Sequence, residues 1–112
     1  MRTRRPVFVI IVAVAAALAC AAAFTFRVSA DDTDVHIVNF VYSPAVLTVP
    51  AGTAVRFIND DTDPHTVSSL RGAFESGVME KGDTWTYTFD TAGTYDYYCI
   101  PHPFMLARVI VQ

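Results

Sequence analysis

A strict alternation of threonines and aromatic residues is the feature of this sequence that most restricts its fold. It runs Thr84-Trp85-Thr86-Tyr87-Thr88-Phe89, with turn sequences on either side, Lys81-Gly82-Asp83 before it and Thr91-Ala92-Gly93 after it. Successive side chains of a β-strand point to opposite faces of the sheet, so such a segment buries its aromatic residues and exposes its threonines. We therefore predict a half-buried strand over residues 84–89.

Other period-two segments follow the same logic, and no stretch of residues 31–112 has the period of an amphipathic helix. Strands are predicted over Val35–Tyr42, Val46–Val49, Thr53–Asn59, Thr94–Cys99 and Leu106–Val111, with extended structure at His65–Val67 and one short strand within Ser68–Glu80. A set of about seven short strands is typical of a Greek-key β-sandwich or barrel, so the fold class is predicted to be all-β. Alternation along Thr94–Cys99 predicts that Cys99 points into the core.

Residues 1–30 differ in composition from the rest of the chain. Three arginines in MRTRRP precede Val7–Phe26, a segment without a charged residue, and this order is typical of an export signal. Val28-Ser29-Ala30 supplies the small residues of a cleavage site. Residues 1–30 are therefore predicted to be a signal peptide, removed from a mature domain of residues 31–112.

Two alternatives to cleavage stay open. Residues 7–26 are long enough to span a bilayer, and as a retained membrane anchor they would leave the arginines in the cytoplasm. Cys20, which follows small residues, is the alternative site of a lipid anchor. All three interpretations place residues 31–112 outside the cytoplasm, in the periplasm or another extracytoplasmic compartment.

The predicted mature domain is small and acidic. Residues 31–112 contain four basic side chains and all eleven acidic ones, a formal charge of −7 (4 − 11). Nucleic-acid binding is disfavoured, because phosphate contacts need a basic surface, whereas a basic protein partner is compatible with this charge. Small exported domains are often held together by a disulfide. Cys99 is the only cysteine of residues 31–112, so no disulfide can form within this domain. A bound metal is predicted to stabilise it instead.

Four side chains with metal-binding chemistry stand out, and each also has an ordinary structural interpretation. His65 follows a polar loop, Cys99 suits a buried core position, and Met105 lies between two apolar residues. His102 lies between two prolines, which stiffen the loop and remove two backbone donors. Taken singly, His65, Cys99 and Met105 do not decide between the two interpretations.

Taken together, the four side chains indicate one metal site. Two imidazoles, a thiolate and a weakly binding thioether are the ligand set of a blue-copper electron-transfer site. Cys99, His102 and Met105 follow the spacing C-x-x-H-x-x-M, so one tight loop can bring them together, and His65 must come from a neighbouring loop. Structural zinc is disfavoured, because a thioether is a poor zinc ligand. Multicopper enzymes need further histidines and only His36 is left, so no enzymatic activity is predicted.

The segment Tyr95–Met105, YDYYCIPHPFM, resembles the C-terminal copper loop of the cupredoxin family, and within that family the loop of the amicyanins. Phe57–Asn59 with Asp63–His65 resembles the family's segment that bears the first histidine, and Val49–Val55 resembles its strand–turn–strand. The resemblance covers nearly all of residues 35–112. The predicted domain is shorter than amicyanin at its N-terminus, which implies that an edge strand is missing.

The resemblance implies a Greek-key cupredoxin fold that holds one type 1 copper and cycles it between Cu(II) and Cu(I). The implied copper ligands are His65, Cys99, His102 and Met105. Asn59 is the implied brace of the ligand loop near the thiolate, since outer hydrogen bonds fix metal ligands and tune the metal.

The implied function is the transfer of single electrons between extracytoplasmic redox proteins by a monomer. By resemblance, a periplasmic dehydrogenase is the expected donor and a c-type cytochrome the expected acceptor. The ring edge of His102 is the predicted electron port, and Pro101, Pro103 and Phe104 form the predicted apolar docking patch around it. An extracytoplasmic copper carrier with the same ligands is the alternative function.

Overall fold

The computed structural model describes residues 33–112, and the predicted leader of residues 1–30, with its alternative anchor over residues 7–26, lies outside the described residues. The described part of the chain forms eight β-strands. They are β1 (Asp34–Val38), β2 (Val41–Ser43), β3 (Val46–Val49), β4 (Thr53–Asn59), β5 (Ser68–Ser69), β6 (Thr84–Phe89), β7 (Gly93–Tyr98) and β8 (Leu106–Val111). In this range no helix has the length and apolar character needed to cross a membrane.

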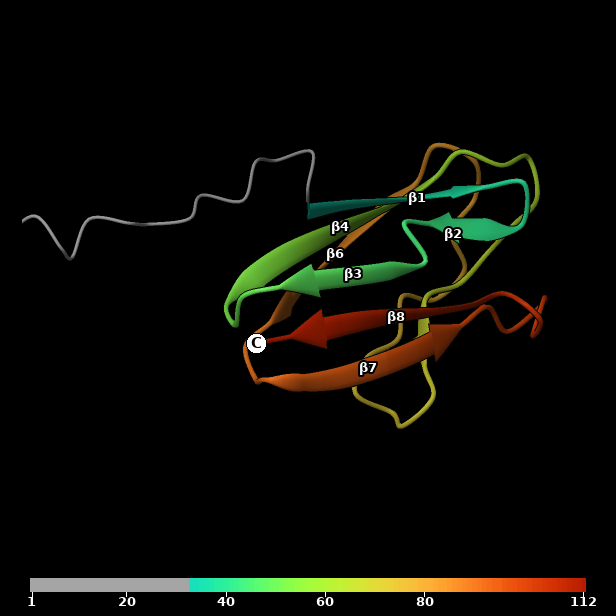
Figure 1. Ribbon diagram of the computed structural model, residues 1–112. Helices are drawn as coiled ribbons and strands as arrows, with labels where there is room; N and C mark the ends of the chain where they lie inside the picture. Colours follow the sequence, from blue (N-terminus) through green and yellow to red (C-terminus); the bar gives the residue numbers. More distant parts are fainter. Residues whose placement is uncertain (1–32) are drawn as a thin grey trace, which may run out of the picture.

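The strands form two four-stranded sheets that pack as a β-sandwich (Figure 1). The first sheet has the order β2-β1-β4-β6 and the second the order β3-β8-β7-β5. β1 runs parallel to β4 and β3 runs parallel to β8, whereas all other neighbours are antiparallel. The prediction of an all-β sandwich is confirmed, with eight strands rather than about seven.

The additional strand comes from a hairpin near the start of the domain. Asn39 and Phe40 both have positive φ, 52° and 60°, as both central residues of a type I′ turn do. β1 and β2 therefore fold back on each other, with Val38 opposite Val41. The prediction of a single strand over Val35–Tyr42 is wrong here, because a bulky residue such as Phe40 rarely adopts this conformation and gives no turn signal in the sequence.

The apolar faces of the two sheets meet in one core. β4 and β8 show the expected alternation, each burying every second residue along most of its length. The largest fully buried side chains include Tyr97, Phe57, Phe89 and Ile37. Trp85 and Tyr87 are half-buried and stack on each other with ring centroids 5.6 Å apart, so the alternating strand β6 lines the core as predicted.

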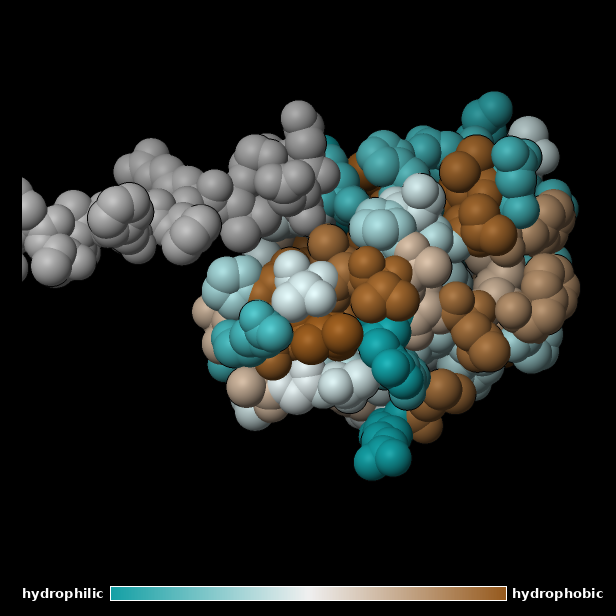
Figure 2. Space-filling model, viewed as in Figure 1, coloured by the Kyte–Doolittle hydropathy of each residue, from teal (hydrophilic) through white to brown (hydrophobic). Residues whose placement is uncertain are grey.

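Apolar side chains also lie on the outer face of the second sheet. Val46, Leu70 and Leu106 are exposed there, and Figure 2 shows apolar surface over β3 and β8. Arg108 of β8 lies opposite Val46 of β3 and forms an ion pair with Asp96 of β7, with Nε 2.6 Å from Oδ1. Exposed apolar side chains of this kind are ordinary on the surface of a small domain.

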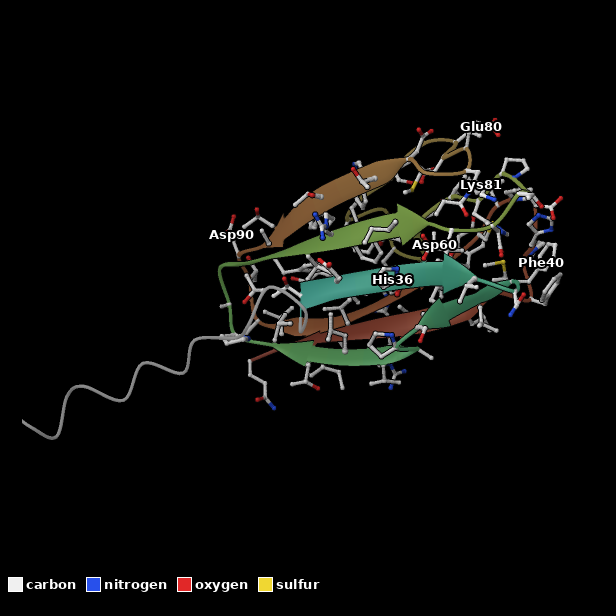
Figure 3. The ribbon with its side chains drawn as sticks, turned by 90° about the horizontal axis from the view of Figure 1, so that it is seen from above. His36, Phe40, Asp60, Glu80, Lys81 and Asp90 are labelled. Atoms are coloured by element: carbon white, nitrogen blue, oxygen red, sulfur yellow. The ribbon has the colours of Figure 1, made fainter. Side chains whose placement is uncertain are left out.

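One end of the sandwich collects segments that are far apart in the sequence. β4 ends there at Asn59, β7 ends there at Tyr98, and the β1–β2 turn brings Phe40 to the same end. Figure 3 shows Phe40 at this end of the molecule and Asp90, from the turn between β6 and β7, at the opposite end. The candidate ligands follow the strands that end here.

Candidate metal centre

Backbone hydrogen bonds fold the β7–β8 loop into two successive turns. The amide of His102 donates to the carbonyl of Cys99 at 3.2 Å, and the amide of Met105 donates to the carbonyl of His102 at 2.9 Å. The amide of Cys99 donates to the carbonyl of Met105 at 3.3 Å and closes the base of the loop. The two-residue gaps of the C-x-x-H-x-x-M motif are therefore the spacing of these turns.

The four candidate ligands differ in exposure. Cys99 and His65 are fully buried, and Met105 is 2% exposed. His102 is half-buried at the surface of the loop. The prediction that Cys99 points into the core is confirmed, and the loop gives the site one buried side and one side that faces solvent.

The structure brings His65 and Cys99 together directly. His65 Nδ1 lies 3.6 Å from Cys99 Sγ. The ring of His102 lies beside that of His65, with ring centroids 5.1 Å apart. Within residues 33–112, no group of three or more His, Cys, Asp and Glu side chains is arranged to hold a metal ion. The thiol and the first imidazole are thus directly paired, and the ring of His102 lies next to the first imidazole.

The separation of the two buried donors fits a shared metal ion. Ligands at about 2.0 and 2.3 Å, the lengths of metal bonds to imidazole nitrogen and thiolate sulfur, are about 3.7 Å apart at a trigonal angle. The 3.6 Å between His65 Nδ1 and Cys99 Sγ agrees with this value. A soft thiolate beside two imidazoles, with a thioether in the same loop, suits copper better than zinc, magnesium or calcium.

Asp61 fixes the orientation of the His65 ring. Asp61 Oδ2 lies 2.8 Å from His65 Nε2, and the same carboxylate accepts from the amides of Asn39 at 2.7 Å and Phe40 at 3.0 Å. Burial raises the pKa of the Asp61 carboxyl, but the two amides and His65 outweigh burial and leave that pKa below its usual range. Because a carboxylate only accepts, Nε2 of His65 is the donor in this contact, and in the neutral ring the lone pair lies on Nδ1, the atom that faces Cys99.

Asn59 braces the loop that carries His65. Its side-chain amide donates to the carbonyls of Asp63 at 3.0 Å and Met79 at 2.8 Å, and its Oδ1 accepts from the amide of Asp61 at 2.9 Å. The contact to the sulfur itself comes from another residue, because the amide of Thr66 lies 3.4 Å from Cys99 Sγ.

Phe40 covers the two histidines. Its ring meets those of His65 and His102 edge-on, with centroids 5.3 Å and 5.0 Å away, and lies 6.4 Å from the ring of Phe104. Sequence reasoning identified neither Phe40 nor Asp61 nor Thr66 as part of the site. The only local signal was the acidic loop that contains Asp61, which is equally typical of a turn.

The predicted docking residues lie at the surface around His102. Pro101 and Pro103 are exposed, and Phe104 is 71% exposed. His36, which sequence reasoning left out of the site, is on the exposed face of β1 with Nδ1 2.6 Å from Asp60 Oδ2. The predicted electron port, His102, and the three predicted docking residues around it therefore lie together at the surface of one loop. His36 lies outside the cluster of candidate ligands.

Known proteins are similar to this chain in both sequence and fold. The profile of the cupredoxin-like domain matches residues 8–111. Amicyanin from Paracoccus versutus is 39% identical over 90 residues, which are 76% of this chain and 68% of that protein. Chloroplastic plastocyanin from Tetradesmus obliquus is 35% identical over 64% of this chain and 59% of that protein.

Solved structures give the same result. An oxidised amicyanin variant superposes with a TM-score of 0.70 at 34% identity, over 77% of this chain and 87% of that chain. A Cu-containing nitrite reductase from Thermus scotoductus superposes with a TM-score of 0.68 at 27% identity, but this chain spans only 22% of that one.

The two-sheet sandwich with a C-x-x-H-x-x-M loop at one end defines the class of blue-copper domains. The chain belongs to the cupredoxin family. The cofactor of its cupredoxin relatives is one type 1 copper, and one of the solved amicyanin structures is a Cu(I) form.

Proposed function

We propose that this chain is an exported electron-transfer protein that carries one electron at a time on a single copper held by His65, Cys99, His102 and Met105. The observation that carries the proposal is the buried pair of His65 Nδ1 and Cys99 Sγ, 3.6 Å apart, beside the loop that carries His102 and Met105. The relatives named above, amicyanin and plastocyanin, are copper electron-transfer proteins, which supports the same function here.

The protein holds the ligands in place by its own contacts. Copper, when bound, supplies the reversible one-electron step, for which a thiolate, imidazoles and a weak thioether are suited. Asp61 accepts from Nε2 of His65, so that the other ring nitrogen, Nδ1, faces Cys99, and the Thr66 amide points to the sulfur of Cys99. Ligands fixed in this way move little between the two oxidation states, which favours rapid transfer.

Electrons are proposed to enter and leave through His102. Its ring is half-buried, while Pro101, Pro103 and Phe104 around it are exposed. A small apolar patch around a half-exposed ligand suits the brief encounters of redox proteins. The proposed partners are a periplasmic dehydrogenase as donor and a c-type cytochrome as acceptor, met by a monomer.

The proposal includes no enzymatic activity of this chain. Of its three histidines, two belong to the proposed copper site and His36 is hydrogen-bonded to Asp60 on an exposed face.

The proposed domain boundaries are a signal peptide over residues 1–30 and the copper domain over residues 31–112, and the proposed location is periplasmic or extracytoplasmic. The basic and then apolar composition of residues 1–30 supports export.

The visible spectrum of the copper-loaded protein tests the ligand set. The purified protein with Cu(II) is expected to show an intense thiolate-to-copper charge-transfer band, and Cys99→Ser is expected to abolish it. Repeated reduction and reoxidation without loss of metal is expected of an electron carrier, whereas a copper carrier releases metal to a partner. A colourless protein that prefers zinc to copper would contradict the proposal.

A further inference from the structure

A chain of hydrogen-bonded groups runs from the peptide after Cys99 to the surface at Glu75. The amide of Ile100 donates to Thr66 Oγ1 at 2.9 Å. Thr66 Oγ1 and Ser68 Oγ are 2.8 Å apart, and Ser68 Oγ donates to Glu75 Oε2 at 2.5 Å. Thr66 and Ser68 are 3% and 4% exposed, whereas Glu75 is exposed. Two buried hydroxyls thus connect a surface carboxylate to the copper loop.

The direction of each hydrogen bond in this chain follows from counting protons. A carboxylate only accepts, and each hydroxyl has one proton to donate. Ser68 gives its proton to Glu75, so its oxygen must accept the proton of Thr66. Thr66 Oγ1 then has no other proton and accepts from the amide of Ile100. Glu75 therefore sets the orientation of both hydroxyls.

Glu75 is held in place by the backbone rather than by its side chain alone. Ser68 and Glu75 face each other in an antiparallel bridge. The amide of Ser69 donates to the carbonyl of Phe74, and the amide of Ser76 donates to the carbonyl of Val67, each at 3.0 Å. The segment that carries Glu75 is therefore fixed against the segment that carries the two hydroxyls.

We propose that Glu75 is a positioning residue for the copper thiolate and acts through Ser68 and Thr66. Thr66 is the junction, because its side chain holds the amide of Ile100 while its own amide points to Cys99 Sγ at 3.4 Å. This chain of hydrogen bonds from Glu75 through Ser68 and Thr66 to the amide of Ile100 is called the relay below. It fixes the rotamer of Thr66 and, through it, the peptide group between Cys99 and Ile100. The inference rests on the proposed function in that Cys99 is taken as a copper ligand.

The relay has a predicted effect on the copper. Hydrogen bonds around the cysteine sulfur tune the redox potential of a blue-copper site. An N–H directed at the sulfur withdraws electron density from the thiolate and so favours Cu(I) over Cu(II). A loosened relay weakens the contact between the Thr66 amide and Cys99, and the potential falls.

Two substitutions at Glu75 distinguish the effect of the hydrogen bond to Ser68 from the effect of the carboxylate charge. Glu75→Ala and Glu75→Gln remove the same charge, but only the glutamine carbonyl can still accept the proton of Ser68. In the metal-free protein, amide exchange of Ile100 is expected to be about tenfold faster in Glu75→Ala than in Glu75→Gln. In the copper-loaded protein, Glu75→Ala is expected to shift the equilibrium about threefold toward Cu(II) relative to Glu75→Gln, or ~30 mV at 59 mV per tenfold for one electron.

Two further variants serve as controls. Ser68→Ala interrupts the relay inside the protein and is expected to reproduce Glu75→Ala. Glu80→Ala removes another exposed carboxylate and is expected to leave Ile100 exchange unchanged. Equal exchange rates and equal potentials in the two Glu75 variants would overturn the inference, whether or not they differ from the parent protein. Failure to bind copper would instead refute the proposed function, while the metal-free exchange measurement would still decide on the relay.

Discussion

Asp61 shows how one residue can join parts of the site that are distant in the sequence. Its carboxylate accepts from the amides of Asn39 and Phe40 and contacts His65 Nε2. In Asp61→Asn one of the two oxygens becomes an NH₂ group, which must then face either the amide of Asn39 or both the amide of Phe40 and His65 Nε2. Copper affinity is expected to fall about 10- to 100-fold, as for the loss of other outer-shell partners of metal ligands. Competition with a copper chelator measures the affinity.

Asp63→Asn is the matched control for this prediction. Asp63 lies in the same loop and bears the same charge, but among residues 33–112 its hydrogen bond is made by the backbone carbonyl, which accepts from Asn59. Copper affinity is expected to change less than twofold, because a lost charge at an exposed loop position is largely screened. An equal loss in the two variants would show that the charge of the loop, and not the contact with His65, is what matters.

Tyr42 and Tyr97 are buried tyrosines that differ in one respect. The Tyr42 hydroxyl donates to the carbonyl of Thr66, whereas the Tyr97 hydroxyl has no partner among the groups of residues 33–112. Tyr97→Phe is expected to leave the free energy of unfolding unchanged or to raise it by about 1 kcal/mol, because an unpaired buried hydroxyl is costly. Tyr42→Phe is expected to lower it by about 1–3 kcal/mol, because the Thr66 carbonyl loses its donor. Denaturant unfolding measures both free energies. Equal losses of stability in the two variants would contradict the assignment of a hydrogen-bonded hydroxyl to Tyr42 and an unpaired one to Tyr97.

Residue chemistry explains which site residues were predictable. Cys99, His102 and Met105 form a local pattern with a characteristic ligand chemistry, so the sequence is enough to propose them. Asp61 has no such pattern, because its amide partners are 22 and 21 residues away and belong to a turn that the sequence does not signal. Thr66 was missed for a related reason, since its contact with Cys99 spans 33 residues.

The β1–β2 hairpin is the element whose backbone is least suited to its sequence. Phe40 has a φ of 60°, a conformation that costs a residue with a Cβ about 1–2 kcal/mol. Phe40→Gly and Phe40→Ala both remove the ring that covers His65 and His102, but only glycine relieves the backbone. Phe40→Gly is therefore expected to exceed Phe40→Ala by about 1 kcal/mol in free energy of unfolding, measured by urea denaturation. Equal stability would mean that the turn changes conformation when the ring is removed.

Strand positions were more predictable than strand partners. Val46–Val49, Thr53–Asn59, Thr84–Phe89 and Leu106–Val111 are strands with the predicted bounds, because alternation is a property of each segment alone. The order of the strands in the sheets was not predicted. In particular, the sequence did not predict that β1 pairs in parallel with β4 or that β3 pairs in parallel with β8. Those pairs depend on which apolar faces meet in the core, and a single sequence does not contain that information locally.

At the scale of the domain, residues 31–112 have an excess of acidic side chains, and the proposed copper loop lies at one end of the described sandwich. Residues 31–112 carry a formal charge of −7, and charge of one sign steers partners of the opposite sign during diffusion. Asp60 and Asp90 are placed differently with respect to the site. Figure 3 shows Asp60 toward the end where Phe40 lies and Asp90 at the far end. Steering toward the copper loop should therefore depend on Asp60 more than on Asp90.

Asp60→Asn and Asp90→Asn test this steering, since each removes one charge by the same substitution and asparagine at position 60 can still accept from His36. Electron exchange with a basic c-type cytochrome, followed by stopped flow at low ionic strength, is expected to slow about twofold in Asp60→Asn and little in Asp90→Asn. The difference is expected to vanish as salt shortens the screening length from about 10 Å at 0.1 M to about 3 Å at 1 M. Equal effects of the two substitutions would place the docking surface elsewhere, and a rate independent of salt would exclude a basic partner of this kind.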